Sequence, residues 1–338
     1  MRTLSSLTQP VVLPIRDEMP RAGSQVWIVL ASYNGAAYIE HQIRSICQQT
    51  WSDWQLYVRD DHSRDDTVAR VQAMAAQDPR IHLLPDLPGE PGAVGNFAAL
   101  LHYAAQHAVD YLFFADQDDD WPNHKLACQL AAMQRLEAEH GRTTPLLVHS
   151  DLALVDADLQ PLAPSFVASS GLFPTQADLG VLLCQNQITG CATLINQALL
   201  KLAAPLPVGV RMHDWWLALL AASCGKIGYL PQALVNYRQH GRNAVGASSR
   251  LQRMRQALNV AAWRRYQDIM RRNVQQAQSL LQRLDTPPLA AEVRTQITLF
   301  AHIAEQPRWR RVSLLRQHLI SPHLPAARWA VFAFITLL

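Results

Sequence analysis

The stretch VWIVLASYN, residues 26–34, decides the fold class. Its first five residues form a continuous apolar run, which is typical of a strand buried on both faces of a parallel sheet. Three polar residues, Ser32, Tyr33 and Asn34, follow at once. Ligands of parallel α/β sheets bind beyond the carboxyl ends of the strands, so these three residues are the first candidates for a binding site.

The same arrangement recurs over the next ninety residues or so. Helical spacing of apolar residues over 39–47 is followed by strand-like alternation over 54–59. The pattern continues with a helix after residue 65, a strand at 81–84, a helix over 97–104 and a strand at 111–115. Strand and helix thus alternate four times with short connections. This predicts right-handed βαβ units and the α/β class, with a Rossmann-like, mostly parallel sheet flanked by helices.

Three regions differ in composition. Residues 1–24 contain three prolines and no periodicity, and we expect them to be a flexible leader. Residues 25–247 hold the α/β pattern, which is completed by strands near 146–148, 188–195, 226–230 and 233–237 and by a helix over 213–224. Residues 248–338 are expected to form a basic helical C-terminal region.

Charge is unevenly divided along the chain. From Arg250 onward the sequence carries fourteen arginines, no lysine and four carboxylates, a net charge of +10, whereas residues 1–249 carry −7. The acidic N-terminal part is suited to binding cations, and the basic C-terminal part is suited to contact with an anionic surface or an anionic acceptor. We therefore expect the C-terminal helices to dock on an anionic membrane surface, with a solvated bundle or a dimer interface as the alternative.

Bulk composition indicates a globular chain, with 49% hydrophobic and 17% charged residues. Five cysteines without a C-x-x-C pair favour reduced thiols over disulfides or a zinc ribbon. The sequence has neither the apolar core of a signal peptide nor a run of about 18 apolar residues. The predicted location is the cytoplasm, with peripheral attachment to the inner face of the cell membrane as an option.

Carboxylates at two strand ends predict a metal and nucleotide site. Asp116 and Asp118 follow the strand at 111–115, and Asp60 and Asp61 follow the strand at 54–59. Mg²⁺ and Mn²⁺ prefer carboxylate oxygens, and carboxylates this close together repel unless a cation or protons neutralise them. A carboxylate at a strand end can also accept bonds from a base N–H or a ribose hydroxyl. Solvated acidic turns and helix capping are the alternatives.

A candidate general base opens the helix over 213–224. Asp214 lies in its first turn and is followed by Trp215 and Trp216. The helix dipole favours an acidic residue here, so ordinary capping is one explanation. The other is a base that deprotonates an attacking hydroxyl, with the two indoles stacking on sugar rings as an acceptor-binding surface. Paired tryptophans fit a core equally well, so the spacing leaves both interpretations open.

Two later positions are weaker candidates. Thr189 and Gly190 allow the backbone to approach a ligand closely, or mark a strand bulge. His240 follows the last strand and is either a third metal ligand or a surface residue. The sequence has no G-x-G-x-x-G, P-loop, G-x-S-x-G or H-E-x-x-H motif, and its basic tail has no nucleic-acid-binding motif. Dinucleotide redox chemistry, P-loop phosphoryl transfer and nucleic-acid binding are therefore disfavoured.

Seven motifs taken together resemble the family 2 glycosyltransferases, near the bacterial rhamnosyltransferase-like branch. In order within residues 26–247 they are VLASYNG (29–35), RDDHSRD (59–65), GAVGNF (92–97), FADQDD (114–119), ITGC (188–191), HDWW (213–216) and YRQHG (237–241). One such motif carries little information, but seven in the family's order and spacing are specific. Residues 248–338 fall outside the match.

This resemblance implies a GT-A fold and a metal-dependent inverting glycosyltransferase of cell-surface polysaccharide synthesis. The enzyme would move a sugar, with rhamnose as one candidate, from a dTDP- or UDP-sugar to a hydroxyl of a glycan or lipid-linked glycan. It implies that Asp116, Asp118 and His240 hold Mg²⁺ or Mn²⁺, and that Asp214 is the base. The residues implied to bind the nucleotide sugar are Ser32, Tyr33, Asn34, Asp60, Asn96, Gln117, Thr189 and Gly190.

Two positions depart from the family's usual pattern. His62 stands where glycine is usual, and Gly95 stands where a basic residue is common, which removes one expected pyrophosphate contact. The competing hypotheses are a nucleotide-sugar-binding protein or nucleotidyltransferase without glycosyl transfer, and a scaffold with basic recruiting helices. A nucleotidyltransferase needs a Gly-rich basic loop soon after the first strand, which residues 32–38 lack, and a scaffold leaves Asp214 unexplained.

Overall fold

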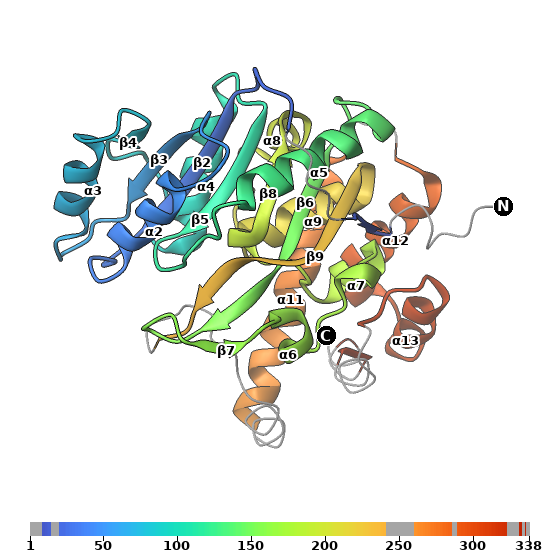
Figure 1. Ribbon diagram of the computed structural model, residues 1–338. Coiled ribbons are helices and arrows are strands. Elements are labelled where there is room, and N and C mark those ends of the chain that lie inside the picture. The colour runs from blue at the N-terminus through green and yellow to red at the C-terminus, as the bar shows by residue number, and fades with distance from the viewer. Residues whose placement is uncertain are drawn as a thin grey trace.

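A single large sheet forms the centre of the molecule (Figure 1). The computed structural model describes residues 9–14, 20–240, 260–285, 289–322, 331–332 and 335. Within them the nine-stranded sheet has the order β1-β9-β6-β8-β5-β2-β3-β4, with β7 paired to β6. The strands are β1 (Val11–Val12), β2 (Val26–Ser32), β3 (Gln55–Asp60), β4 (Ile81–Leu83), β5 (Tyr111–Asp116), β6 (Leu146–Val155), β7 (Pro161–Ala163), β8 (Thr193–Asn196) and β9 (Lys226–Arg238).

Helices connect the strands and continue beyond them. The helices are α2 (Ile39–Cys47), α3 (Thr67–Ala75), α4 (Ala93–Ala105), α5 (Lys125–His140), α6 (Phe166–Ser170), α7 (Leu179–Cys184), α8 (Gln197–Ala203), α9 (His213–Cys224), α11 (Val260–Arg283), α12 (Ala291–Ala301) and α13 (Arg308–Gln317). Short 3₁₀ turns are η1 (Pro174–Gln176), η2 (Gly190–Ala192) and η3 (Ile303–Glu305).

The sheet is mostly parallel, which confirms the predicted α/β class. The pairs β2–β3, β2–β5, β3–β4, β6–β9 and β1–β9 are parallel, whereas β8 runs antiparallel to its neighbours β5 and β6, and β7 runs antiparallel to β6. Two predicted strands differ in extent. The strand expected near 188–195 begins only at Thr193, because residues 190–192 form a 3₁₀ turn, and the two strands expected after residue 226 join into β9 across a register shift.

Hydrophobic cores lie on both faces of the sheet. Along β2, Trp27 and Val29 face the core formed with α4, α8 and α9, whereas Ile28 and Leu30 face the core formed with α2, α3 and α5. Successive side chains of a strand point to opposite faces, so a strand covered on both sides must be apolar throughout. This accounts for the apolar run at 26–30.

The prediction of a flexible leader over residues 1–24 is wrong for residues 11–13. Strand β1 pairs with β9, Leu13 is buried, and its backbone N–H donates to the carbonyl of Tyr229 at 2.8 Å. A two-residue strand has no period that sequence reasoning can detect, and its position depends on an edge formed about 215 residues later. Residues 1–8 and 15–19 lie outside the described part of the chain.

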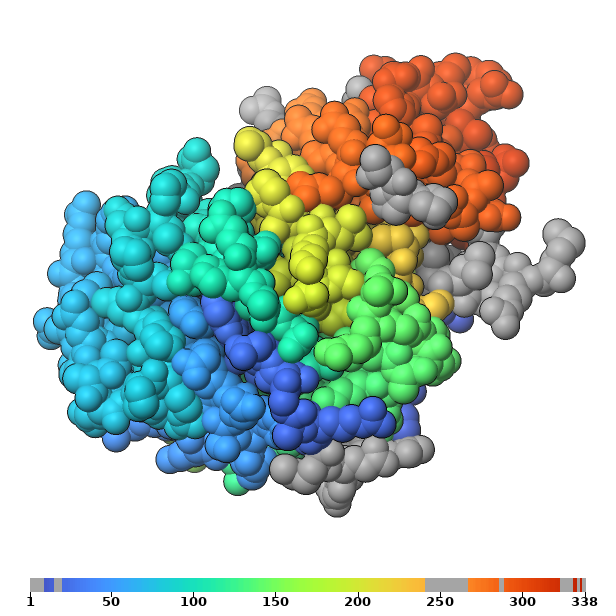
Figure 2. All heavy atoms as spheres, turned by 90° about the horizontal axis from the view of Figure 1, so that it is seen from above, coloured from blue at the N-terminus to red at the C-terminus, as the bar shows by residue number. Residues whose placement is uncertain are grey.

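The C-terminal region is helical where it is described, as predicted. Helices α11 and α12 pack against α7, and α11 also packs against α9. They share a core with these helices through buried residues such as Met270, Leu280 and Phe300. In Figure 2 the orange C-terminal helices lie against the yellow part of the chain. The predicted boundary at residue 247 lies outside the described residues. None of the described helices is both long enough and apolar enough to cross a bilayer.

Candidate active site

Three strand ends meet at one edge of the sheet. In the ladders of β2, Ser32 lies opposite Asp60 of β3, and Ala31 lies opposite Asp116 of β5. The polar residues that follow these strands therefore flank a common edge, because parallel strands bring their carboxyl ends together. The expected convergence of these polar clusters is confirmed.

Asp60 is held by a compact set of donors. Its carboxylate accepts the hydroxyl of Ser32 at 3.0 Å and both the backbone N–H and the hydroxyl of Ser63, at 2.7 and 2.6 Å. Asn34 completes the turn: its N–H donates to the Ser63 hydroxyl at 2.7 Å, and its side-chain oxygen accepts the Arg64 N–H at 2.8 Å. These bonds fix a half-buried carboxylate between the ends of β2 and β3.

Gln117 and Asn96 connect the strand ends to one another. The Gln117 amide accepts the backbone N–H of Tyr33 at 2.8 Å and donates to its carbonyl at 3.0 Å. It lies so close to Gly35 that a Cβ there would come within 2.2 Å of its oxygen. The buried Asn96 donates from its amide nitrogen to the carbonyls of Ser32 and Arg59, both at 3.2 Å. Both residues position the edge, and their contact with a nucleotide stays a prediction.

The two departures from the family pattern have local explanations. His62 has a φ of 62°, in the left-handed region where glycine is favoured. A Cβ at Gly95 would lie 1.7 Å from the carbonyl oxygen of Glu90, so this backbone has no room for a basic side chain there. Asp61 organises the same loop, because its carboxylate accepts the N–H of Gly92 at 2.7 Å.

His240 contacts Asp118, the carboxylate that is predicted to bind the same metal ion. Its Nε2 lies 2.7 Å from Oδ2 of Asp118. The imidazole stacks on the ring of Tyr38, with ring centroids 4.8 Å apart. Arg238 ties the two segments together, since its Nε donates to the Asp118 carbonyl at 2.8 Å. The end of β9 thus joins the ends of β2, β3 and β5.

Near Asp118 and His240 lies an acidic cluster, and of its members the sequence predicted only Asp116 as a metal ligand. Asp116, Asp119 and Cys191 each place one ligand atom within 4.8 Å of the others. Burial, together with the charges of Asp118 and Asp214, raises the pKa of Asp116 to about 7. Burial likewise raises the pKa of Asp119, whose Oδ2 has no hydrogen-bond partner. Asp119 and Cys191 stand in separate motifs, and no spacing rule shows that they meet.

Asp214 is a buried carboxylate facing this cluster. Burial raises its pKa to about 7, while hydrogen bonds from the backbone N–H groups of Trp215 and Gly190 and from the Asn186 amide oppose the rise. The Trp215 N–H lies 2.5 Å and the Asn186 nitrogen 3.1 Å from Oδ1. Asn186 was not predicted, because nothing in the sequence links it to a residue 28 positions later.

Gly190 is required by packing around the base. A Cβ at this position would lie 2.6 Å from Nε2 of His213. That imidazole is buried against Phe97, with ring centroids 3.9 Å apart, and burial lowers its pKa to about 3, so it is neutral. The neighbouring Thr189 accepts the hydroxyl of Thr193 at its carbonyl, at 2.9 Å. Ligand contact by either residue of the Thr-Gly pair stays a prediction.

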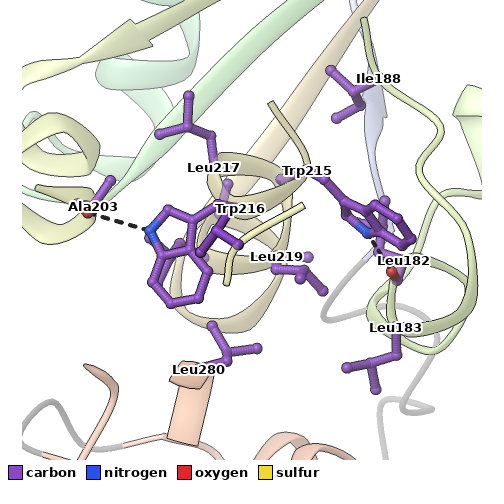
Figure 3. Close-up of a cluster of buried hydrophobic side chains, with 14 of the residues drawn as sticks. Leu182, Leu183, Ile188, Ala203, Trp215, Trp216, Leu217, Leu219 and Leu280 are labelled. Atoms are coloured by element: carbon purple, nitrogen blue, oxygen red, sulfur yellow. Dashed lines mark hydrogen bonds between the residues drawn. The ribbon is translucent and has the colours of Figure 1, made fainter. Parts of the chain in front are cut away.

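The predicted acceptor surface on Trp215 and Trp216 is wrong. Both indoles lie in the core, with 6% and 0% of their surface exposed (Figure 3). Their ring N–H groups donate to the carbonyls of Leu182 and Ala203, at 2.6 and 3.2 Å (Figure 3). Helix α9 is apolar on all sides because it lies between the sheet and the C-terminal helices, so no face of either ring is open to a sugar.

The mostly parallel sheet, its cluster of strand-end carboxylates and the single buried carboxylate on a facing helix together define a glycosyltransferase with the GT-A fold. The chain belongs to glycosyltransferase family 2. The model of "Glycosyl transferase family 2" matches residues 27–141. Asp214 and His240 lie beyond that match, so their roles rest on geometry.

Curated relatives agree with this assignment. The chain is 36% identical over 210 residues to UDP-Glc:alpha-D-GlcNAc-diphosphoundecaprenol beta-1,3-glucosyltransferase WfgD of Escherichia coli, covering 60% of this chain and 74% of that protein. It is 29% identical over 224 residues to dTDP-rhamnosyl transferase RfbG of Shigella flexneri, covering 65% and 74%. Membership in an enzyme family decides against the scaffold, the non-catalytic binding protein and the nucleotidyltransferase.

A solved structure shares the fold. Mannosyltransferase PcManGT from Pyrobaculum calidifontis, solved in complex with GDP-Man and Mn²⁺, superposes with a TM-score of 0.53 and 18% sequence identity. The match covers 98% of this chain and 85% of that one. At 18% identity this similarity shows a common fold and no more, and its coverage includes the described C-terminal helices.

Proposed function

We propose that this family 2 enzyme transfers a sugar with inversion, in bacterial polysaccharide synthesis, with Asp214 as the general base. The observation that carries the proposal is one buried carboxylate, Asp214, close enough to the acidic cluster for its charge to raise the pKa of Asp116. Inversion by single displacement needs one base on the acceptor side, whereas retention by double displacement needs a second carboxylate as nucleophile.

The geometry gives Asp214 the properties of a base. Its pKa of about 7 leaves it partly ionised near neutral pH and able to take a proton from a hydroxyl. Bonds from Asn186 and from the backbone of Trp215 and Gly190 hold one orientation of the carboxyl group. Burial keeps bulk water from the proton-accepting oxygen, which favours a sugar hydroxyl over water as the attacking group.

The residues fit a hard divalent cation, Mg²⁺ or Mn²⁺. Asp116 and Asp118 supply carboxylates, His240 supplies an imidazole beside Asp118, and the orphaned oxygen of buried Asp119 is the kind of atom that a nearby cation stabilises. Cys191 is a poor ligand for these ions because burial raises the pKa of its thiol. When bound, the cation would neutralise charge that develops on the leaving diphosphate.

For the donor we propose a nucleotide-diphosphate sugar whose nucleoside lies over the ends of β2 and β3. Asp60 is held there by Ser32 and Ser63 with its carboxylate partly exposed, which suits a base N–H or a ribose hydroxyl. The relatives act with dTDP- and UDP-linked sugars according to their names, so dTDP-rhamnose and UDP-glucose are the first donors to test.

For the acceptor we propose a glycan hydroxyl, carried on a lipid diphosphate as in the name of the Escherichia coli relative. Such an acceptor would require peripheral contact with the cytoplasmic face of the membrane. Helix α13 and the residues just after it offer a surface for this contact: Trp309 in the helix is 79% exposed, and Leu319, two residues beyond its end, is 53% exposed. Arg308, Arg310 and Arg316 of the same helix are also exposed, and the guanidinium of Arg310 lies over the ring of Trp309. An exposed indole among arginines is the composition of an interfacial helix that meets anionic lipid.

Transfer assays test the catalytic proposal. Purified enzyme is incubated with a panel of nucleotide sugars and glycan acceptors, with and without EDTA, and product anomers are assigned by NMR. We expect one donor to react, EDTA to stop the reaction and the new bond to have inverted configuration. Retained configuration, or full activity in EDTA, would contradict the proposal.

Vesicle sedimentation tests the membrane proposal separately. Wild-type enzyme should bind vesicles that contain phosphatidylglycerol at low salt and release at high salt, because the contact is largely electrostatic. Trp309→Ala with Arg310→Ala should weaken binding without changing transfer to a soluble acceptor. Equal binding of the double variant, or no vesicle binding by the wild type, would remove α13 from membrane attachment.

A further inference from the structure

Helix α11 lies against the segment that leads into the catalytic helix α9. The backbone N–H of Arg211 donates to the side-chain oxygen of Gln276 at 3.0 Å, and its guanidinium donates to the side-chain oxygen of Asn273 at 3.2 Å. Asn273 in turn donates to the carbonyl of Cys184 at the end of α7. These bonds hold Arg211 against α11. Arg211 stands three residues before Asp214 in the sequence.

A second arginine, Arg272, lies on the same side of α11. Arg272 lies one helical turn before Gln276, so both side chains leave α11 on the side that holds Arg211. Burial lowers the pKa of Arg211, and the charge of Arg272 lowers it further. The two guanidinium groups thus lie on the same side of α11, close enough for the charge of Arg272 to act on Arg211.

Within the described ranges neither Arg211 nor Arg272 forms an ion pair. The only carboxylate in α11 is Asp268, which pairs with Arg271 at 3.0 Å. Because two neighbouring cations repel each other, both of them stabilise an anion that binds between them. Guanidinium groups bind phosphate oxygens through directed, charge-assisted hydrogen bonds.

We propose that Arg211 and Arg272 form a phosphate-binding subsite for the acceptor, which recognises a phosphate or diphosphate attached to the sugar that Asp214 deprotonates. The guanidinium of Arg211 lies over the ring of Trp215, 5.1 Å from its centroid, and Trp215 directly follows the base. The subsite rests on the proposed function, since it assumes that the acceptor hydroxyl reacts at Asp214.

The donor diphosphate has a different place. The carboxylates and the histidine that suit a cation-bound diphosphate lie at the ends of β5 and β9. Arg211 comes instead from the segment just before α9, and Arg272 comes from α11. An acceptor phosphate held there would fix the attached sugar ring between the arginines and the base, which aligns one hydroxyl for attack.

Titration with inorganic pyrophosphate in EDTA tests the subsite directly. Chelation removes the cation that would hold pyrophosphate at the carboxylates, and comparison with the variants separates binding at Arg211 and Arg272 from binding at other arginines. We expect the wild type to bind, Arg272→Gln to bind about tenfold more weakly or worse, and the adjacent Arg271→Gln to bind like the wild type. Arg211→Lys, which keeps the charge but loses the planar fork, should be intermediate. No wild-type binding, or equal loss in the Arg271 control, would overturn the proposal.

Two further measurements identify the source of the phosphate. The KM for an acceptor glycosyl diphosphate should rise in Arg272→Gln, whereas the KM for the same sugar as a neutral glycoside should not. Binding of UDP with Mn²⁺ should be unchanged; its loss would assign the arginines to the donor and overturn the acceptor subsite. Weaker binding to phosphatidylglycerol vesicles with an unchanged KM would assign them to lipid headgroups instead. If the wild-type enzyme transfers no sugar at all, the proposed function is contradicted, whereas the pyrophosphate titration still tests the arginines independently.

Discussion

Replacing Asp214 by Asn should abolish transfer and, at the same time, stabilise the protein at alkaline pH. The side chain is 7% exposed, and burial raises its pKa from the ordinary 3.8 to about 7. An amide keeps an oxygen for the bonds from Asn186 and Trp215 but takes no proton at these pH values. The rate should therefore fall by about 10²–10⁴-fold, as expected for loss of a general base.

The stability effect follows from the same pKa. A carboxyl group whose pKa is raised on folding opposes folding once it ionises, so its contribution is fully favourable below pH 3.8 and is lost as the pH rises through about 7. A rise from 3.8 to about 7 corresponds to about 4 kcal/mol above pH 7. Asp214→Asn should recover part of this free energy at pH 8 and little of it at pH 4.

Three measurements separate the outcomes. Transfer rates against pH should rise through about 7 in the wild type and stay at background in the variant. Urea unfolding at pH 4 and pH 8 should show a stability gain for the variant only at the higher pH. UDP and Mn²⁺ should bind both proteins, since removing the charge of Asp214 lessens repulsion at Asp116. Full activity of the variant, or equal stability at pH 8, would refute the assignment of a buried base.

The remaining predictions concern packing around the site. Trp216→Ala should lower the free energy of unfolding by about 3–5 kcal/mol because the ring is fully buried, whereas Trp309→Ala, at 79% exposure, should change it by less than about 0.5 kcal/mol in the same urea titration. Gly190→Ala should lower the melting temperature and the rate, because its methyl group would meet His213 at 2.6 Å; adding His213→Ala should restore part of the melting temperature. Tyr38→Leu should weaken Mn²⁺ binding in calorimetry and Tyr38→Phe should not, because only a ring keeps the stack at 4.8 Å on the metal-side imidazole.

The sequence by itself determined the sheet and most of the strand-end site. An apolar run such as 26–30 fits only a strand covered on both faces, and parallel strands must present the residues that follow them at one edge. That is sufficient to place Ser32, Asp60 and Asp116 together. The first turn of α9, with its acidic residue, was likewise predicted at residue 213, where the helix begins.

Tertiary structure decided what each side chain does. The pair Trp215 and Trp216 fits a sugar platform or a core by spacing alone, and only the layers on both sides of α9 make it core. The strand at Val11–Val12 exists because β9 offers an edge, and Asn186 matters because the chain folds it onto Asp214. Local patterns encode period and polarity, but burial, partner and pKa depend on segments distant in sequence, so only the packed chain specifies them.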